Sequence, residues 1–248
     1  MAPSPLRESC LRVASRGECV ANALGIEYPF CMRTFLGWPA LLVLIAASLS
    51  ACSSSKVSDE NPEALYQDAE SEIKGDRFQV AIDKLRMLKS KFPYSRFAAE
   101  AQLRIADVYF KQELFQEAAL AYEAFRDLHP KHERAAYALF RVAESYQADM
   151  PSNIARDLSS GKRALEAYDD FLKQYPAEER VAQAKESLGV VRSILARKEL
   201  VVANFYYGES QYDSAKGRYE KILKTYPETD SATQAQERLK ISEEKLKE

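Results

Sequence analysis

The chain has few of the residues on which redox chemistry, metal binding and nucleophilic catalysis depend. Its 248 residues include four cysteines and two histidines. Every cysteine lies at or before Cys52, so the residues that follow offer no thiol. A disulfide framework, a CxxC redox site and a cysteine-based metal site are therefore excluded after Cys52.

Histidine and glycine give no catalytic signal either. His129 and His132 lie close together, but Glu133 is the only carboxylate beside them, so a metal ion would lack ligands. His129 also takes a helix-end position that aromatic residues hold elsewhere in the chain, which favours a packing role. No glycine-rich phosphate loop, HExxH or GxSxG motif is present. We predict no metal, no cofactor and no catalytic residue.

Neither sign of charge dominates. With the four arginines and three glutamates before Cys52 set aside, 31 basic and 34 acidic residues remain. This balance gives no general attraction to nucleic acid or to anionic lipid, so nucleic acid is not an expected partner. Ala, Glu, Lys, Leu and Arg are frequent, and apolar residues nowhere alternate for long, which predicts an all-α fold.

The long apolar run near the start of the chain ends in Leu49-Ser50-Ala51-Cys52, the pattern of a bacterial lipobox. Cleavage between Ala51 and Cys52 would free the amine of Cys52. We predict that Cys52 carries an S-diacylglycerol and an N-palmitoyl group. A transmembrane anchor is the alternative, but residues 35–51 contain Pro39 and are shorter than the ~20 residues of a comfortable span.

The lipobox divides the chain into segments with different fates. Residues 1–31 fit no export signal, and we interpret them as an upstream start extension that is not native. Residues 32–51 form a lipoprotein signal peptide. Residues 52–62 are a lipidated, serine-rich tether that reaches ~20 Å on average. Ser53 after the lipidated cysteine favours the outer membrane, with the domain on its periplasmic face.

Four prolines close segments that share one apolar pattern. An alanine stands twelve residues before each proline, and large apolar residues stand eight and five before it, as on one face of a helix. A second alanine lies twelve residues earlier in three of the four segments, and 21 earlier in the third, which predicts a loop insertion there. The two sets of alanines are Ala69, Ala106, Ala143 and Ala203, and Ala81, Ala118, Ala164 and Ala215.

This spacing is typical of tetratricopeptide (TPR) repeats, each an antiparallel helix pair. We predict a TPR superhelix, an α-solenoid of about four to five repeats, with Gly75-Asp76 and Gly208-Glu209 in turns between paired helices. The expected segments are TPR 1 at 63–93, TPR 2 at 95–130, TPR 3 with its insertion at 132–176, a long helix and TPR 4 at 178–227, and a capping helix at 230–248.

The first helix of each repeat should line the concave face of such a stack, where partners bind. Alignment on the alanines places on this face Tyr66, Glu70, Ile73 and Lys74, then Leu103, Asp107, Phe110 and Lys111, then Leu200, Asn204 and Tyr207. Aromatic and charged residues together suit a binding groove. Packing against the next repeat is the alternative for each residue taken singly.

The repeat region resembles the BamD (YfiO) family of outer-membrane-protein assembly lipoproteins over residues 63–247. The resemblance is carried by LYQDA at 65–69, GDRF at 75–78, FPYSRF at 92–97 and VVANFYY at 201–207. It implies membership of the β-barrel assembly (BAM) complex, with unfolded outer-membrane precursors, a POTRA domain of BamA and other Bam lipoproteins as partners. It implies no enzymatic activity.

The resemblance also assigns sides to the expected surface. On the BamA side it implies Arg218, with Tyr207 and Asn204 beside it. On the substrate side it implies Tyr94 and Phe97, placed in the turn after Pro93, with Tyr66, Phe110 and Lys111 of the aligned face.

Other periplasmic TPR scaffolds are the alternatives. Tol-Pal-associated coordinators place a coiled coil before the repeats, and no heptad run follows Cys52. A pilotin-like lipoprotein that escorts a secretin stays open. A hydrolase with attached TPRs is excluded, because about 185 residues of repeat leave no room for a catalytic domain.

Overall fold

The computed structural model describes residues 61–247, which lie in the second of two compact units, residues 55–248. The predicted upstream extension, signal peptide and Cys52 fall outside the described residues, as does most of the tether. Among residues 61–247, no helix combines the length and the apolar character needed to cross a bilayer.

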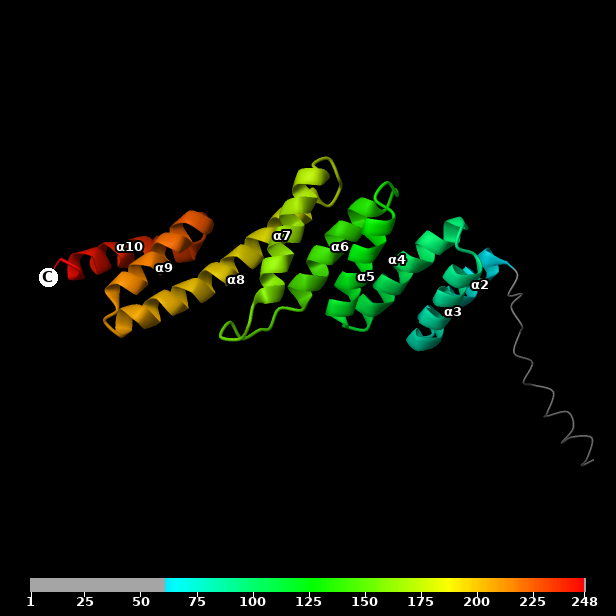
Figure 1. Ribbon diagram of the computed structural model, residues 1–248, viewed down its shortest axis with the longest axis horizontal. Helices are drawn as coiled ribbons and strands as arrows, with labels where there is room; N and C mark the ends of the chain where they lie inside the picture. The colour runs from blue at the N-terminus through cyan, green and yellow to red at the C-terminus, as the bar shows by residue number, and fades with distance from the viewer. Residues whose placement is uncertain (1–60, 248) are drawn as a thin grey trace, which may run out of the picture. The chain divides into compact units, whose positions relative to one another are not determined.

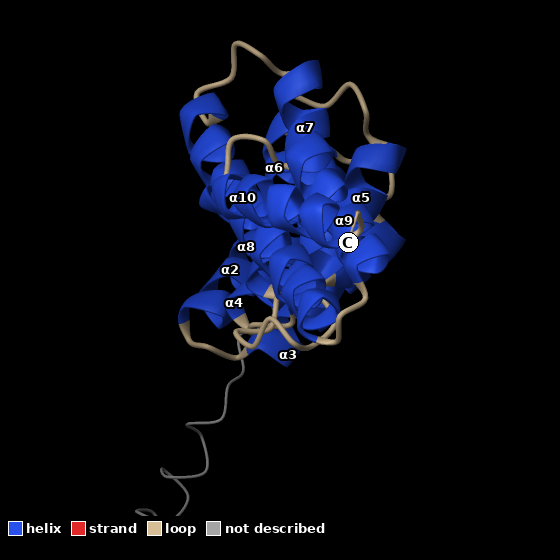
Figure 2. Cartoon of the chain, turned by 90° about the vertical axis from the view of Figure 1, so that its left-hand side faces the viewer, coloured by secondary structure: helices blue, strands red, loops and turns tan. Residues whose placement is uncertain are grey.

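Nine helices and no strand are found in this part of the chain (Figures 1 and 2). They are α2 Pro62–Lys74, α3 Phe78–Lys91, α4 Arg96–Lys111, α5 Phe115–Leu128, α6 Ala135–Ala148, α7 Ser159–Gln174, α8 Val181–Gly208, α9 Tyr212–Thr225 and α10 Asp230–Lys245. Each helix packs against the next along the chain, and α8 also contacts α10. The predicted all-α stack of helix pairs is confirmed.

The recurring alanines let paired helices approach closely. All eight have a relative exposure of 0%. The large residues eight and five positions before each proline, such as Tyr122 and Phe125, are equally buried. A small residue on one helix facing a large residue on its neighbour fills the interior at high density, so the sequence pattern follows directly from packing.

The residue before each proline ends its helix in the same conformation. Phe92, His129, Tyr175 and Tyr226 have φ between −128° and −133° and ψ between 49° and 58°. The proline ring disfavours helical angles in the residue before it, so the helix stops there. The same tight turn follows each time, closed for example by Ser95 N–H donating to the Phe92 carbonyl at 3.0 Å.

The turns within three of the pairs close without glycine in the left-handed position. Asp76, Glu113 and Ser210 have φ of 55°, 61° and 59°, and no described glycine has a positive φ. The next residue then donates to a carbonyl five positions back, as Arg77 does to Glu72 at 2.9 Å. This bond is the outer bond of a Schellman motif. The prediction for Gly208 was wrong in detail: it is the last residue of α8, and Ser210 makes the turn.

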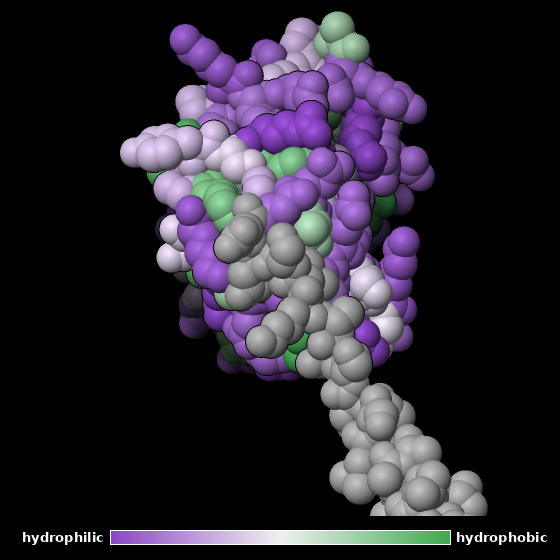
Figure 3. Space-filling view, turned by 90° about the vertical axis from the view of Figure 1, so that its right-hand side faces the viewer, coloured by the Kyte–Doolittle hydropathy of each residue, from purple (hydrophilic) through white to green (hydrophobic). Residues whose placement is uncertain are grey.

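Within residues 61–247 the interior consists of three clusters of buried residues, formed by α2–α4, by α4–α8 and by α8–α10. Helix α8 contributes Val191 to the middle cluster and Ala203 to the last, so its 28 residues join them. The exterior is mainly hydrophilic, with isolated apolar residues, on the face that Figure 3 shows.

Candidate functional site

A groove opens between α4 and α6, the first helices of the second and third pairs. Its volume is about 560 Å³. We name it the α4–α6 groove, and it is lined by Arg104, Asp107, Phe110, Lys111, Glu113, Phe115, Tyr137 and Arg141. Phe110 and Lys111 were expected here, and the structure brings them together with a cluster of arginines and phenols.

Asp107 is the central acceptor of the groove. Its Oδ1 accepts hydrogen bonds from the hydroxyls of Tyr122 at 2.6 Å and Tyr137 at 2.9 Å. Arg104 approaches Oδ2 at 3.5 Å from the same helix. Burial, together with this carboxylate, raises the pKa of both phenols. Asp107 therefore ties α4 to α5 and α6 and forms part of the groove's floor.

Arg141 places a cation on an aromatic surface. Its guanidinium carbon lies 3.7 Å from the centroid of the Phe110 ring. The same group donates to Tyr122 Oη at 3.2 Å and to Glu144 Oε2 at 2.8 Å. Burial would lower the pKa of Arg141, but its acceptors, Tyr122 above all, hold that pKa above the ordinary value. The groove thus offers a fixed aromatic face and fixed charge side by side.

A second cluster adjoins the groove where α2 meets α4. Arg104 donates to both carboxylate oxygens of Glu70, at 2.6 and 2.8 Å. The rings of Tyr66 and Phe97 lie 5.7 Å apart. Burial first, and then the charge of Glu70, raises the pKa of Tyr66 to about 12. These two expected residues therefore form one aromatic patch.

Other expected residues lie elsewhere. Ile73 and Leu103 are buried at 4% and 0% exposure, so they pack in the interior and not on a binding face. Phe97 belongs to the first turn of α4 and not to the preceding turn, because Ser95 caps that helix. Tyr94 does lie in the turn and is fully exposed. Lys111 is held by Asp76 at 2.8 Å.

The expected residues of the C-terminal half are dispersed over α8 and α9. Arg218 pairs with Glu199 at 2.9 Å. Asn204 Oδ1 accepts from the Tyr219 hydroxyl at 2.8 Å, which joins α8 to α9. Tyr207 lies beneath the guanidinium of Arg238, 5.3 Å from its ring centroid. Each residue already has a partner within the chain.

Sequence reasoning missed Arg104, Tyr137 and Arg141. A signal for the two arginines was present, since each stands two residues before a first-helix alanine, Ala106 or Ala143. The acceptors Asp107 and Glu144 follow the same alanines by one residue. Positions three apart on a helix are neighbours, so the repeated Arg and acid predict a recurring ion pair.

No metal site is evident among residues 61–247, where no three His, Cys, Asp or Glu side chains are placed to hold an ion. His129 and His132 both pack against the Phe125 ring, with centroids 5.3 and 5.2 Å away.

Comparison with known proteins gives a consistent result. The chain is 28% identical over 223 residues to the outer membrane protein assembly factor BamD of Neisseria gonorrhoeae, covering 83% of this chain and 84% of the relative. It is 27% identical over 206 residues to BamD of Vibrio cholerae, covering 79% of this chain and 86% of that relative. It is also 27% identical over 217 residues to BamD of Caulobacter vibrioides, covering 84% of this chain and 71% of that relative.

A crystal structure of a Podosopora anserina protein with nearly identical TPR-like repeats aligns at a TM-score of 0.39 and 14% identity, covering 75% of this chain and 85% of that chain. This similarity is too low to carry an argument. A family model described as YfiO, outer membrane lipoprotein, matches residues 58–248. The match spans more than half of the sequence, and the chain belongs to the YfiO family of outer membrane lipoproteins.

Proposed function

We propose that this chain is an assembly factor for outer-membrane β-barrel proteins and works within the BAM complex. The names of its relatives support this role, because they are outer membrane protein assembly factors that align over most of their length. Cys52 would carry the lipid that holds the chain at the periplasmic face of the outer membrane. The repeats would bind partners, and no bond is made or broken.

Unfolded barrel precursors are the proposed ligand of the α4–α6 groove. The supporting observation is the pairing of Phe110 with Arg141 beside the exposed part of Tyr137. An extended chain presents apolar and aromatic side chains as well as unpaired main-chain groups. A fixed aromatic face with fixed donors can satisfy both, and it loses little side-chain entropy on binding. Tyr66, Phe97, Lys111 and the exposed Tyr94 would extend this surface.

BamA is the proposed partner of the C-terminal half, through a POTRA domain. Arg218 is 40% exposed although it is paired, and Tyr207 and Asn204 lie on the neighbouring helix α8. Accessory Bam lipoproteins would bind elsewhere on the repeats.

Two measurements test these assignments. Photo-crosslinking from position 110 to an unfolded barrel precursor should fall severalfold in an Arg141→Ala variant, and an unchanged yield contradicts the groove assignment. Arg218→Glu should weaken co-purification of BamA from membranes. Lys221→Glu is the matched control, because Lys221 binds the same Glu199 carboxylate at 2.6 Å. Equal BamA recovery with Arg218→Glu and wild type would contradict the assignment of Arg218.

A further inference from the structure

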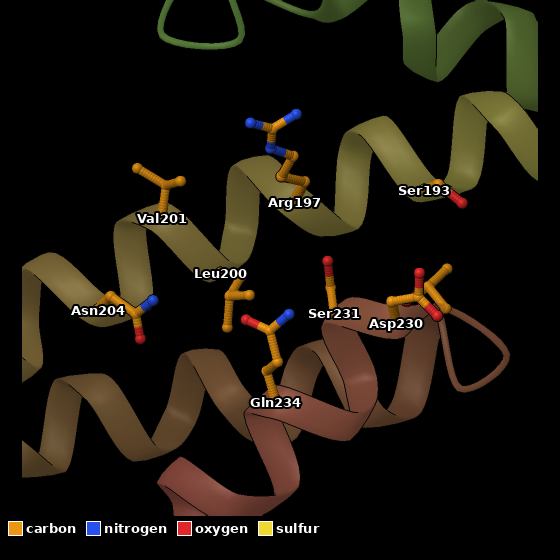
Figure 4. Close-up of a pocket in the computed structure, with 9 residues that line it drawn as sticks. Ser193, Arg197, Leu200, Val201, Asn204, Asp230, Ser231 and Gln234 are labelled. Atoms are coloured by element: carbon orange, nitrogen blue, oxygen red, sulfur yellow. The ribbon is translucent and has the colours of Figure 1, made fainter.

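A second pocket lies between α8 and the start of α10 (Figure 4). Its volume is about 380 Å³, near the lower end for ligand sites. Arg197 and Val201 project from the side of α8 that faces away from α10, while Leu200 and Asn204 lie toward α10. Ser231 and Gln234 of α10 point back toward α8. We name this the α8–α10 pocket.

Helices α4 and α6 each carry an ion pair on their exposed side, Arg104–Asp107 and Arg141–Glu144. Helix α8 lacks the corresponding residues. At the positions of Arg104 and Arg141, two before the alanine, α8 has Val201. At the position of Asp107, one after it, α8 has Asn204. A ligand carboxylate at the α4–α6 groove must compete with acids that already hold the arginines. At the α8–α10 pocket no acid of the described residues pairs with Arg197.

Arg197 supplies an unused cation. It is exposed, and within residues 61–247 no hydrogen bond, ion pair or ring contact engages its side chain. Arg192, five residues earlier on the same helix, pairs with Glu228 and donates to the Thr225 carbonyl. Val201 beside Arg197 is 53% exposed, so an unpaired guanidinium and an open aliphatic surface adjoin each other.

We propose that the α8–α10 pocket binds an extended polypeptide segment in which an acidic side chain neighbours an aliphatic one. Arg197 pairs with the carboxylate, and the exposed side chain of Val201 contacts the aliphatic group. The carboxamide of Gln234, the hydroxyl of Ser231 and the Nδ2 amide of Asn204, whose Oδ1 is held by Tyr219, bind the main chain. These polar groups favour an extended segment over a helix, because a helix has already used its main-chain donors and acceptors.

This inference rests on one part of the proposed function, that the repeats bind unfolded polypeptide. It adds a subsite in the C-terminal half that selects for charge. Asp230 also lines the pocket, and no ion pair joins it to Arg197 in the described part of the chain. Its negative charge opposes an acidic ligand. Asp230→Asn should therefore tighten binding of an acidic segment, which an assignment to a basic ligand would not give.

The test uses the full chain and two short fluorescein-labelled peptides of alternating serine and valine. One peptide has an aspartate beside a central leucine, and the other has asparagine in its place. Fluorescence anisotropy should show about fivefold tighter binding of the aspartate peptide, as expected for one partly exposed ion pair. Arg197→Gln should abolish the preference. Arg156→Gln is the matched control, since Arg156 is likewise exposed and its side chain has no partner among the described residues.

Several outcomes would overturn the proposal. The proposal fails if the Arg197→Gln variant still prefers the aspartate peptide. It also fails if the wild type binds the two peptides equally. Loss of the preference in Arg141→Ala with Arg197→Gln unaffected would place acid selection at the α4–α6 groove instead. Failure of precursor crosslinking at position 110 with a retained aspartate preference would refute the proposed precursor site and leave this pocket standing. Circular dichroism confirms that each variant folds.

Discussion

Removal of the Asp107 carboxylate should be among the most destabilising single changes on the binding surface. Asp107→Ala leaves the hydroxyls of Tyr122 and Tyr137 without their acceptor, and Tyr122 is completely buried. A hydrogen bond to a charged group contributes about 1.5–3 kcal/mol, and a buried donor left unpaired costs a similar amount. Because the two bonds share one acceptor and are not additive, we expect a loss of about 3–4 kcal/mol in the free energy of unfolding.

The assay is urea denaturation of the full chain followed by far-UV circular dichroism, with variants compared at an unchanged slope. Tyr122→Phe alone should cost about 1–1.5 kcal/mol, since Asp107 keeps its other donors. In the Asp107→Ala background, Tyr122→Phe should cost less than in wild type, because the Tyr122 hydroxyl there has lost the acceptor for its proton and keeps only the bond that it accepts from Arg141. Additive losses in the double variant, or a loss below ~1 kcal/mol for Asp107→Ala, would refute the reasoning.

Three further predictions concern backbone and charge. Gly217→Ala should stabilise the chain by about 0.5–1 kcal/mol in the same assay, because a Cβ added there meets no atom of the described residues within 4 Å. Gly161→Ala should gain less, since Met150 lies 3.0 Å from the Cβ position there. Titration of the Tyr66 phenol by difference absorbance should give a pKa near 12. This folded-state pKa lies above the ordinary 10, so the contribution of Tyr66 to the free energy of unfolding is present below pH 10 and disappears as the pH rises toward 12. Burial would raise the pKa of Glu199, but its basic partners hold that pKa below the ordinary 4.5. The contribution of Glu199 to the free energy of unfolding is therefore present above pH 4.5 and is lost on acidification. Arg218→Ala should raise the pKa of Glu199, as measured by carbon-detected NMR.

The outline of the fold could be predicted because its signals are local. An alanine at a fixed distance from an X-Pro step determines both where two helices touch and where the second one ends, and the structure confirms this at Phe92, His129, Tyr175 and Tyr226. Such rules require only the near neighbours of each residue in the chain.

The left-handed turns were less predictable. Gly208-Glu209 was the expected turn after α8, and glycine tolerates a positive φ most readily. The structure uses Ser210, because the turn's hydrogen bonds back to α8 fix which residue must be left-handed. Where main-chain bonds determine the conformation, they outweigh the modest cost of a side chain there.

By itself, the sequence determined the helix pairs, their ends and the residues available to the inner face. Only the tertiary structure decided which of those residues are free to bind. Leu103 turns into the interior, and Asn204 accepts a hydrogen bond from Tyr219. Arg197, two turns before Asn204, has no partner among residues 61–247. The physical reason is that a first helix in a stack is flanked by its own partner and by neighbouring pairs. The fate of each side chain therefore depends on donors and acceptors that are distant in the sequence.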